Sequence, residues 1–304
     1  MGGSMTGFDD QGVSLTAVAV AAGRAVETSR RDPLMEDPFA ALLVEAAHSH
    51  VDFPRVWPAD LAVVSPLQHP LLLASIYIGV RTRFIDDFLL SGPTVQTVIL
   101  GAGLDTRSHR LPWPPGSRVY EIDHANVLAF KADVLGAARA TPSCELSSIE
   151  ADLTHPWRAL LLVSGFDPGQ PTTWVLEGVL PYLDSTAQLA VLTEIVALSS
   201  PGSRAVIERA VPLPKTEEFE AKLREYSQHT GLPMNELLAR ADPPDPVQVL
   251  GAADWQCTAH TVQELCAAYG RTLSLNPEDR RPPEQAVAGQ TRGGFVTAFQ
   301  ILGR

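Results

Sequence analysis

The chain has 304 residues, of which 45% are hydrophobic, so it can bury the core of one large α/β domain or of a domain with a substantial insertion. Its 35 acidic and 23 basic side chains give a formal charge of -12, which repels phosphate backbones and disfavours nucleic acid as a partner. The three cysteines form no CxxC pair, so we expect no disulfide framework, no metal site and a cytoplasmic location. The most apolar early segment, residues 13–22, is too short to span a membrane, and no membrane contact is expected.

The first 90 residues show a mostly helical pattern. Asp32-Pro33 and Asp37-Pro38 interrupt it, and proline is favoured at the first position of a helix after an aspartate cap. This segment is either a packing arm or a lid over a ligand, and the spacing alone does not separate the two interpretations.

From residue 95 onward, short β-type runs alternate with helical stretches. Strands separated by helices predict βαβ units and a parallel sheet with helices on both faces. The predicted strands are Val95–Leu100, Arg118–Asp123, Glu145–Glu150, Thr173–Glu177 and Ser203–Glu208.

The pattern changes between residues 211 and 250. Phe219, Leu223 and Tyr226 recur at helical spacing among many charges, and a proline-rich run at 242–246 then breaks the chain. These features predict a helical insertion with a small apolar face of its own.

Three further elements are expected near the C-terminus. A helix is predicted near Thr261–Tyr269, followed by strands at Arg271–Leu275 and Gly294–Ile301. No crossover helix separates the two strands, so we expect them to pair antiparallel at the edge of the sheet.

The stretch VILGAGLDTRSHRL, residues 98–111, places a Gly-Ala-Gly turn directly after the first predicted strand. The dinucleotide-binding fingerprint requires a third glycine three positions after the second, and this chain has Thr106 there. The missing glycine weakens an NAD interpretation without excluding another nucleotide. A plain tight turn remains an alternative.

Acidic residues end the next strands. Asp123 lies twenty residues after Gly103, where a carboxylate can accept both hydroxyls of a ribose. Asp152 can place a carboxylate beside an adenine, or can cap a helix that begins near Thr154. The fourth strand ends in WVLEGVLPYL. All these ends lie on the carboxyl edge of a parallel sheet, where open α/β folds bind ligands.

Together these motifs resemble a known family. GAGLDTR, EID, ADL and EGVLPYL, preceded by DPLMEDPFA and RTRFIDDFL, are similar to the leucine carboxyl methyltransferase-like family, especially its bacterial branch of S-adenosyl-L-methionine-dependent O-methyltransferases. That branch includes polyketide carboxyl and hydroxyl methyltransferases. The resemblance runs from about Ala17 to the C-terminal FVTAF.

The resemblance implies an α/β class I methyltransferase fold. This fold is Rossmann-like, with a seven-stranded, mostly parallel sheet whose final strand is antiparallel, plus a helical N-terminal arm and a helical lid insertion. We therefore expect four parts: a helical arm at 1–90, a cofactor-binding core at 91–210, a lid at 211–250, and the end of the core sheet at 251–304.

The resemblance also implies roles for individual residues toward S-adenosyl-L-methionine. Arg81 would pair with the methionine carboxylate, which a guanidinium binds in a fork, and Glu177 would lie near the amino group. Arg83 competes with Arg81 for this role, and Arg24 is a lower-ranked second ligand. The predicted cofactor-binding set is Arg81, Gly101, Ala102, Gly103, Asp123, His124, Asp152, Leu153 and Glu177, with Asp123 at the ribose and Asp152 and Leu153 at the adenine.

Other polar residues near the turn are expected to support it. Arg107 and Arg110 are predicted to brace the loop, with Asp105 capping the helix that follows. Tyr182 is a candidate for orienting the methyl acceptor, although the same ring can simply pack beneath a lid.

Methyl transfer from a sulfonium is an in-line displacement that needs aligned reactants rather than a covalent nucleophile. A carboxylate acceptor is already ionised at neutral pH, whereas a phenol needs a general base. His124, His229 and His260 are interpreted as surface or packing residues, so no catalytic residue is named.

The predicted function is an S-adenosyl-L-methionine-dependent O-methyltransferase acting on a carboxylate or hydroxyl of a small molecule, specifically a secondary metabolite. The alternatives are a protein or peptide carboxyl methyltransferase, a nicotinamide-dependent oxidoreductase, and a cofactor-binding protein without turnover. EGVLPYL lacks the Asn/Asp-Pro-Pro-Tyr pattern of exocyclic-amine methyltransferases, which again disfavours nucleic acid. A monomer or homodimer is expected.

Overall fold

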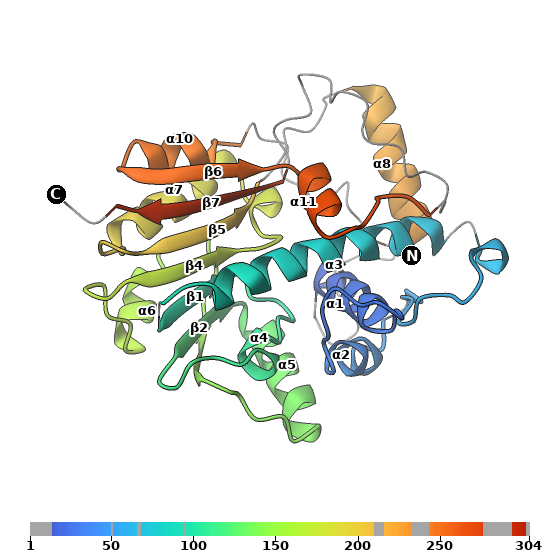
Figure 1. Cartoon of the computed structure of the whole chain (residues 1–304), viewed down its shortest axis with the longest axis horizontal. Helices are drawn as coiled ribbons and strands as arrows, with labels where there is room; N and C mark the ends of the chain where they lie inside the picture. Colours follow the sequence, from blue (N-terminus) through green and yellow to red (C-terminus); the bar gives the residue numbers. More distant parts are fainter. Residues whose placement is uncertain are drawn as a thin grey trace, which may run out of the picture.

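A seven-stranded sheet forms the centre of the molecule, and helices cover both of its faces (Figure 1). The computed structural model describes residues 14–49, 51–65, 68–93, 95–209, 216–230, 232, 243–275 and 294–301. The strand order is β3-β2-β1-β4-β5-β7-β6, with β7 antiparallel to both of its neighbours. The strands are β1 Gln96–Leu100, β2 Arg118–Asp123, β3 Glu145–Glu150, β4 Thr172–Leu176, β5 Arg204–Glu208, β6 Trp255–His260 and β7 Phe295–Gln300. The prediction of a mostly parallel α/β sheet with an antiparallel final strand is confirmed.

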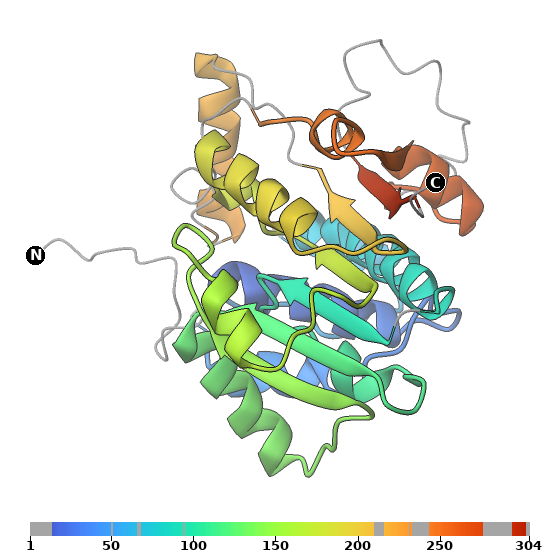
Figure 2. The same ribbon diagram turned by 90° about the vertical axis from the view of Figure 1, so that its left-hand side faces the viewer.

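The central strands are buried on both faces because their side chains alternate between two cores. In β1, Val98 and Leu100 join one apolar cluster, whereas Ile99 joins the other. Helices α6, α7 and α10 cover the first face, and α3, α5 and α11 cover the second (Figure 2). The described helices are α1 Leu15–Thr28, α2 Ala40–Ala46, η1 Leu61–Val63, α3 His69–Leu90, α4 Arg107–Arg110, α5 Ala125–Ala137, α6 Arg158–Val163, η3 Leu180–Tyr182, α7 Ser185–Ala197, α8 Glu217–Thr230, α10 Pro246–Gly251 and α11 Val262–Ala268.

The parallel register brings the predicted strand ends to one edge of the sheet. Leu100, the last residue of β1, is paired with Ile122 of β2 on one side and Leu176 of β4 on the other. The chain runs outward from β1 in both directions, so the carboxyl end of β1 is the switch point at which open α/β sheets bind ligands.

One prediction about the C-terminal strands is wrong. Residues 271–275 form no strand, and Trp255–His260 is the strand that pairs with β7. The expected antiparallel pair at the edge of the sheet is therefore formed by β6 and β7, with β6 outermost. β7 pairs with β5 on one side and with β6 on the other, so it has no free edge with which residues 271–275 could pair as a strand.

The N-terminal arm packs closely against α3. A Cβ on Gly23 of α1 would lie 2.4 Å from Cδ1 of Ile78, and one on Gly79 of α3 would lie 2.8 Å from Cγ of Glu27. The glycines therefore allow the two helices to approach each other, which the packing-arm interpretation requires. The lid interpretation of the arm stays a prediction.

The helix starts expected at the two Asp-Pro pairs are only partly right. Asp37 accepts the amide protons of Phe39 and Ala40, at the start of α2. No helix follows Asp32, which instead pairs with Arg271 at 2.9 Å.

The predicted insertion is described in part. It contains α8 and the start of α10, where Asp245 caps the helix through the amide of Val247. Residues 210–215, 231 and 233–242, and the side chains of Leu223, Tyr226 and His229, lie outside the described residues. No helix within the described part of the chain is long and apolar enough to cross a membrane.

Candidate cofactor site at the carboxyl edge of the sheet

The glycine turn after β1 has the backbone conformation that its sequence predicts. Gly101 and Gly103 have φ angles of 65° and 48°, in the left-handed region that glycine adopts without strain. A Cβ on Gly101 would lie 2.7 Å from Cγ2 of Val179, so this position admits no side chain without displacing the next loop. Ala102 between them is buried, and its amide donates to the carbonyl of Ile122.

Asp123 closes this turn from the neighbouring strand. Its Oδ2 accepts the amide of Gly103 at 2.6 Å, and its Oδ1 accepts the amide of His124 at 2.7 Å. The structure therefore brings the turn and the acid together, and His124, the residue before α5, lies beside them. Each carboxylate oxygen keeps further lone pairs, so the group can still accept hydrogen bonds from a ligand.

Arg81 of α3 reaches the ends of two strands. Its Nε lies 2.8 Å from Oε1 of Glu177, directly after β4, and its Nη1 lies 3.0 Å from Oε2 of Glu208, the last residue of β5. Arg81 is 5% exposed. Burial lowers the pKa of its guanidinium, but Glu208 and Glu177 outweigh this and raise the pKa above its ordinary value, so Arg81 stays charged.

Glu208 and Tyr77 belong to this cluster and were missed by the sequence reasoning. Glu208 accepts hydrogen bonds from the Tyr77 hydroxyl and from the amide of Gly178, the latter at 2.7 Å. Burial and the Glu208 charge raise the pKa of Tyr77 well above its ordinary value, so its hydroxyl is a donor at neutral pH. Glu208 had a usable signal, because it ends a predicted strand on the same edge as Glu177.

Arg107 supports Glu177 from the other side. Its Nη1 donates to Glu177 and Asp105, and its Nε donates to Asp86 at 2.6 Å. Arg110 also donates to Asp86, at 2.6 and 2.9 Å. The predicted bracing role of both arginines is therefore seen, and Asp105 accepts the amide of Arg107 at the start of α4. The connection from Arg107 to Glu177 was not predicted.

These side chains form one buried ion network, which we define as Arg81, Arg107, Arg110, Asp86, Asp105, Glu177 and Glu208. It contains one more carboxylate than guanidinium. Burial raises the pKa of Glu177, but Arg107 and Arg81 outweigh it, so the pKa lies below its ordinary value and the group is ionised. The network therefore attracts a cationic group at the carboxyl edge.

Two predicted residues lie on the third strand's side of the site. Asp152 accepts hydrogen bonds from the amide and hydroxyl of Thr154, at 2.8 and 2.7 Å, so it stabilises a turn. The helix-cap alternative is wrong in detail, because α6 begins only at Arg158. Leu153 is 8% exposed and packs in the core, which leaves its backbone for any ligand contact.

The two arginines that compete with Arg81 have other partners. Arg83 is largely exposed and pairs with Asp87 one turn later on α3, at 2.8 Å. Arg24 is buried, with Nε 2.7 Å from Asp37 and Nη2 2.6 Å from the carbonyl of Leu104. Arg24 thus ties the arm to the loop after the glycine turn.

Tyr182 lies in η3, five residues after Glu177, and is 36% exposed. This exposure leaves the ring accessible from outside the core. The arrangement is consistent with either of the roles considered for it, acceptor orientation or packing beneath a cover.

A family model described as leucine carboxyl methyltransferase matches residues 17–196. The chain belongs to the leucine carboxyl methyltransferase family. A protein of Saccharopolyspora erythraea, named "Putative S-adenosyl-L-methionine-dependent methyltransferase", is 38% identical over 282 residues, which cover 92% of this chain and 96% of the relative. A protein of Mycobacterium avium with the same name is 41% identical over 281 residues, covering 88% and 89%.

The fold also matches a solved structure. A crystal structure of a DUF574 family protein from Streptomyces avermitilis superposes with a TM-score of 0.55 at 12% identity, covering 93% of this chain and 97% of the other. At this identity the similarity concerns the fold alone. With the family established, the chain is an S-adenosyl-L-methionine-dependent methyltransferase, as its motifs predict.

The described residues fit this cofactor in charge and in backbone shape. The excess carboxylate of the ion network complements a ligand that carries an ammonium and a sulfonium against one carboxylate. Gly103 has room for a ligand, because a Cβ there would meet only Ala17, at 3.7 Å. Nη2 of Arg81 makes none of the hydrogen bonds found among the described residues, so it remains as a donor.

Proposed function

We propose that the enzyme transfers the methyl group of S-adenosyl-L-methionine to a carboxylate oxygen of a small molecule, forming a methyl ester. The observation that supports a carboxylate acceptor is that the carboxylates of the ion network, Glu177 included, are already paired. Every carboxylate of the ion network is already held by an arginine, and that of Glu208 also accepts a backbone amide. A carboxylate acceptor needs no general base, whereas a hydroxyl acceptor does.

The acid–base properties of the nearest groups support the same choice. Arg107 and Arg81 keep the pKa of Glu177 low, which makes it a weak base, and the high pKa of Tyr77 keeps its hydroxyl protonated. A hydroxyl acceptor, the other possibility from the sequence, would need a base other than Tyr77 and the carboxylates of the ion network.

In this proposal the side chains bind and align rather than react. Bound S-adenosyl-L-methionine supplies an electrophilic methyl on a sulfonium. Arg81 would hold the methionine carboxylate through Nη2, and Glu177 would lie near the ammonium. Asp123 would accept the ribose hydroxyls, beside the backbone of Gly101, Ala102 and Gly103. The adenine would lie near Asp152 and Leu153. Tyr182 would orient the acceptor.

The decisive experiment uses the alkali lability of esters. Full-length protein is incubated with S-adenosyl-L-methionine carrying a tritiated methyl group and a small-molecule extract, and the products are separated from protein. We expect labelled small molecules that release volatile methanol in alkali. Label that survives alkali would indicate an ether from a hydroxyl acceptor. Label that stays with added protein would indicate a protein carboxyl methyltransferase.

The proposal that the natural acceptor is a secondary metabolite comes from the family resemblance. The same labelled extract tests it, since mass spectrometry of the methanol-releasing species identifies the acceptor. An acceptor from primary metabolism would contradict this part while leaving ester formation intact.

A further inference from the structure

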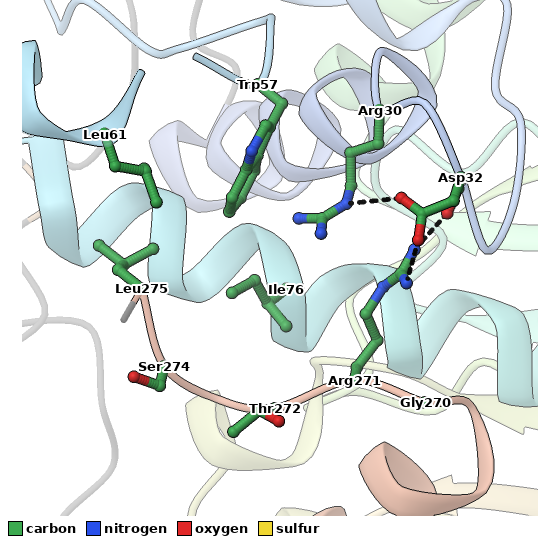
Figure 3. Close-up of a pocket in the computed structure, with 10 residues that line it drawn as sticks. All are labelled: Arg30, Asp32, Trp57, Leu61, Ile76, Gly270, Arg271, Thr272, Ser274 and Leu275. Atoms are coloured by element: carbon green, nitrogen blue, oxygen red, sulfur yellow. Dashed lines mark hydrogen bonds and ion pairs between the residues drawn. The ribbon is translucent and has the colours of Figure 1, made fainter. Parts of the chain in front are cut away.

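A cavity lies away from the ion network, on another face of α3 (Figure 3). It has a volume of about 340 Å³, at the lower end of the size of small-molecule sites. Its walls come from the loop after α1, from η1 and the loop before it, from α3 and from the segment after α11. None of the residues assigned to the cofactor lines it.

The geometry of α3 separates this cavity from the cofactor site. Ile76 forms part of the cavity wall, while Tyr77 and Arg81 point to Glu208 at the sheet. Gly79 and Arg83, on the same side of α3 as Ile76, contact Glu27 and the carbonyl of Leu34 in the arm. The helix itself therefore lies between the two sites.

Arg30 gives the cavity a cation whose donors are poorly used. Its Nε and Nη1 are buried and make no hydrogen bond within the described part of the chain. The nearest carboxylate oxygens, on Glu27 and Asp32, lie 3.6 and 3.9 Å from Nε. One face of the guanidinium lies over the Trp57 ring at 4.0 Å, which positions the group without satisfying its N–H donors.

The carboxylates near Arg30 are committed to Arg271. Glu27 Oε1 accepts Arg271 Nη2 at 3.1 Å and the amide of Leu34 at 2.8 Å. Asp32 Oδ2 accepts Arg271 Nη1 at 2.9 Å. Unpaired buried donors are costly, and groups left in this state usually have a water or a ligand as partner. Arg30 thus lacks the well-aligned anion that Arg271 has.

The remaining walls define the rest of the ligand. Leu61, Leu275 and Ile76 surround the part of the cavity that the Arg30 amino groups face, and Trp57 adds an aromatic wall (Figure 3). An apolar body placed there would be removed from water, which favours binding. The polar end and the apolar end together select an amphipathic molecule.

We propose that this cavity binds a small carboxylate with an apolar body, its carboxylate paired with Arg30 and its apolar part between Leu61, Leu275 and Trp57. The site is separate from the cofactor site and does not depend on the proposed ester chemistry. A single carboxylate matches Arg30, whose nearest carboxylate oxygens lie 3.6 and 3.9 Å from Nε, and the cavity is too small for a macromolecule to enter.

Sodium octanoate is a suitable probe of the full-length protein. Titration is followed by the fluorescence of Trp57, with Trp57→Phe identifying the part of the signal that comes from the cavity. We expect saturable octanoate binding and at least tenfold weaker binding of both acetate, which lacks the apolar body, and n-octanol, which lacks the charge. This comparison uses the unaltered protein, so folding defects do not affect it. Equal affinity for octanoate and octanol, or no saturable binding, would overturn the proposal.

Variants then locate the carboxylate. Arg30→Gln should weaken octanoate binding at least tenfold and leave the affinity for S-adenosylhomocysteine unchanged. Arg55→Gln is the matched control, because Arg55 lies in the same arm, is 47% exposed in its side chain and does not line the cavity. Equal octanoate affinity in the folded Arg30→Gln variant and the control, verified by thermal unfolding, would remove Arg30 from the site.

Discussion

Arg81 holds the carboxylates of two different strand ends while belonging to a helix outside the sheet. Its Nε and Nη1 lie beside Glu177 and Glu208, so Nη2 is the nitrogen without a carboxylate beside it among the described residues. We therefore propose that the methionine carboxylate would meet one nitrogen of Arg81 rather than the forked pair expected from the sequence. The two glutamates hold the guanidinium in a fixed position, which reduces the entropy lost on binding.

Replacing Arg81 should separate its ligand role from its structural role. Arg81→Ala should weaken S-adenosylhomocysteine binding by about 1.5–3 kcal/mol, as for a hydrogen bond to a charged group, and should barely change the affinity for methylthioadenosine, which lacks the amino-acid portion. It should also lower the free energy of unfolding by about 3–5 kcal/mol, because Glu208 loses the arginine that pairs with it and Glu177 keeps only Arg107. Calorimetric titration and urea unfolding measure these effects.

Arg83→Ala is the control on the same helix, since Arg83 is exposed and its partners are Asp87, the carbonyl of Leu34 and the Tyr269 ring. It should leave both affinities unchanged. If Arg81→Ala weakened both ligands equally, Arg81 would be structural, and its assigned role would pass to Arg83 or Arg24.

Asp105 makes stability depend on pH. Burial raises the pKa of this carboxyl, but Arg107 and Lys131 outweigh it and lower the pKa to about 2. Since the folded pKa lies below the unfolded value of about 4, the contribution is present above pH 4 and is lost as the pH falls toward 2. Its size is on the order of 2 kcal/mol.

Urea unfolding at pH 5 and pH 3 tests this expectation. The free energy of unfolding should fall less between these values in Asp105→Asn than in the unaltered protein, because the amide cannot titrate. Asp133→Asn is the matched control, because it makes the same substitution on the exposed side of α5. An unchanged pH dependence in Asp105→Asn would mean that other carboxyls carry the acid sensitivity.

At the scale of elements, helix contacts were less predictable than helix positions. The periodicity of the arm predicts helices, and α1, α2 and α3 form there, but which glycines mediate their packing depends on where the helices meet. Gly23 faces Ile78 within contact distance, whereas a Cβ on Gly136 of α5 would meet nothing within 4 Å. The same residue type therefore has opposite consequences in the two helices.

Two glycine substitutions compare helix propensity with packing. Gly136→Ala should raise the free energy of unfolding by about 0.5–1 kcal/mol, because alanine is the better helix former. Gly23→Ala gains the same propensity, but its Cβ must displace Ile78, and overpacking of this kind costs about 1–3 kcal/mol. It should therefore lower stability. An equal gain in the free energy of unfolding in both variants would show that α1 and α3 adjust to the added methyl group without cost.

The insertion after β5 is the second element with a predicted role. An ion pair between Arg209 and Asp245, at 3.1 Å, holds the two ends of the insertion close together. A short linker can therefore replace the segment between them. Replacing residues 214–242 by a short Gly-Ser linker should spare most of the affinity for S-adenosylhomocysteine and abolish methyl transfer, because a lid excludes water and completes the acceptor site. Retained turnover would contradict the lid role.

At the scale of the whole molecule, the strand order distinguishes this sheet from a dinucleotide-binding sheet. The switch point at β1 is common to dinucleotide-binding and methyltransferase sheets, but β7 is inserted antiparallel between β5 and β6 here. Together with Thr106 in place of the third glycine and the family match, this separates the protein from nicotinamide enzymes.

Ligand-induced stabilisation checks this distinction on the intact protein. S-adenosylhomocysteine at about 100 times its dissociation constant should raise the free energy of unfolding by about 2.7 kcal/mol, since it binds only the folded state. NAD at the same concentration should leave the unfolding temperature unchanged. Stabilisation by NAD alone would overturn the cofactor assignment.

The sequence by itself determined the local parts of the site. Gly101, Gly103 and Asp123 were predictable because the turn and the strand end are set by neighbouring residues, and the parallel sheet follows from the alternation of strands and helices. The family motifs added Arg81 and Glu177.

Only the tertiary structure decided how distant charges pair. Arg81 and Glu208 are 127 residues apart, and Arg271 and Glu27 are 244 apart. Hydrophobic periodicity sets which face of an element is buried, but it carries no information about which carboxylate meets which arginine once the faces pack. For the same reason residues 271–275 form no strand despite their alternating pattern: β6 is the strand that pairs with β7, and Arg271 is drawn to the carboxylates of the arm.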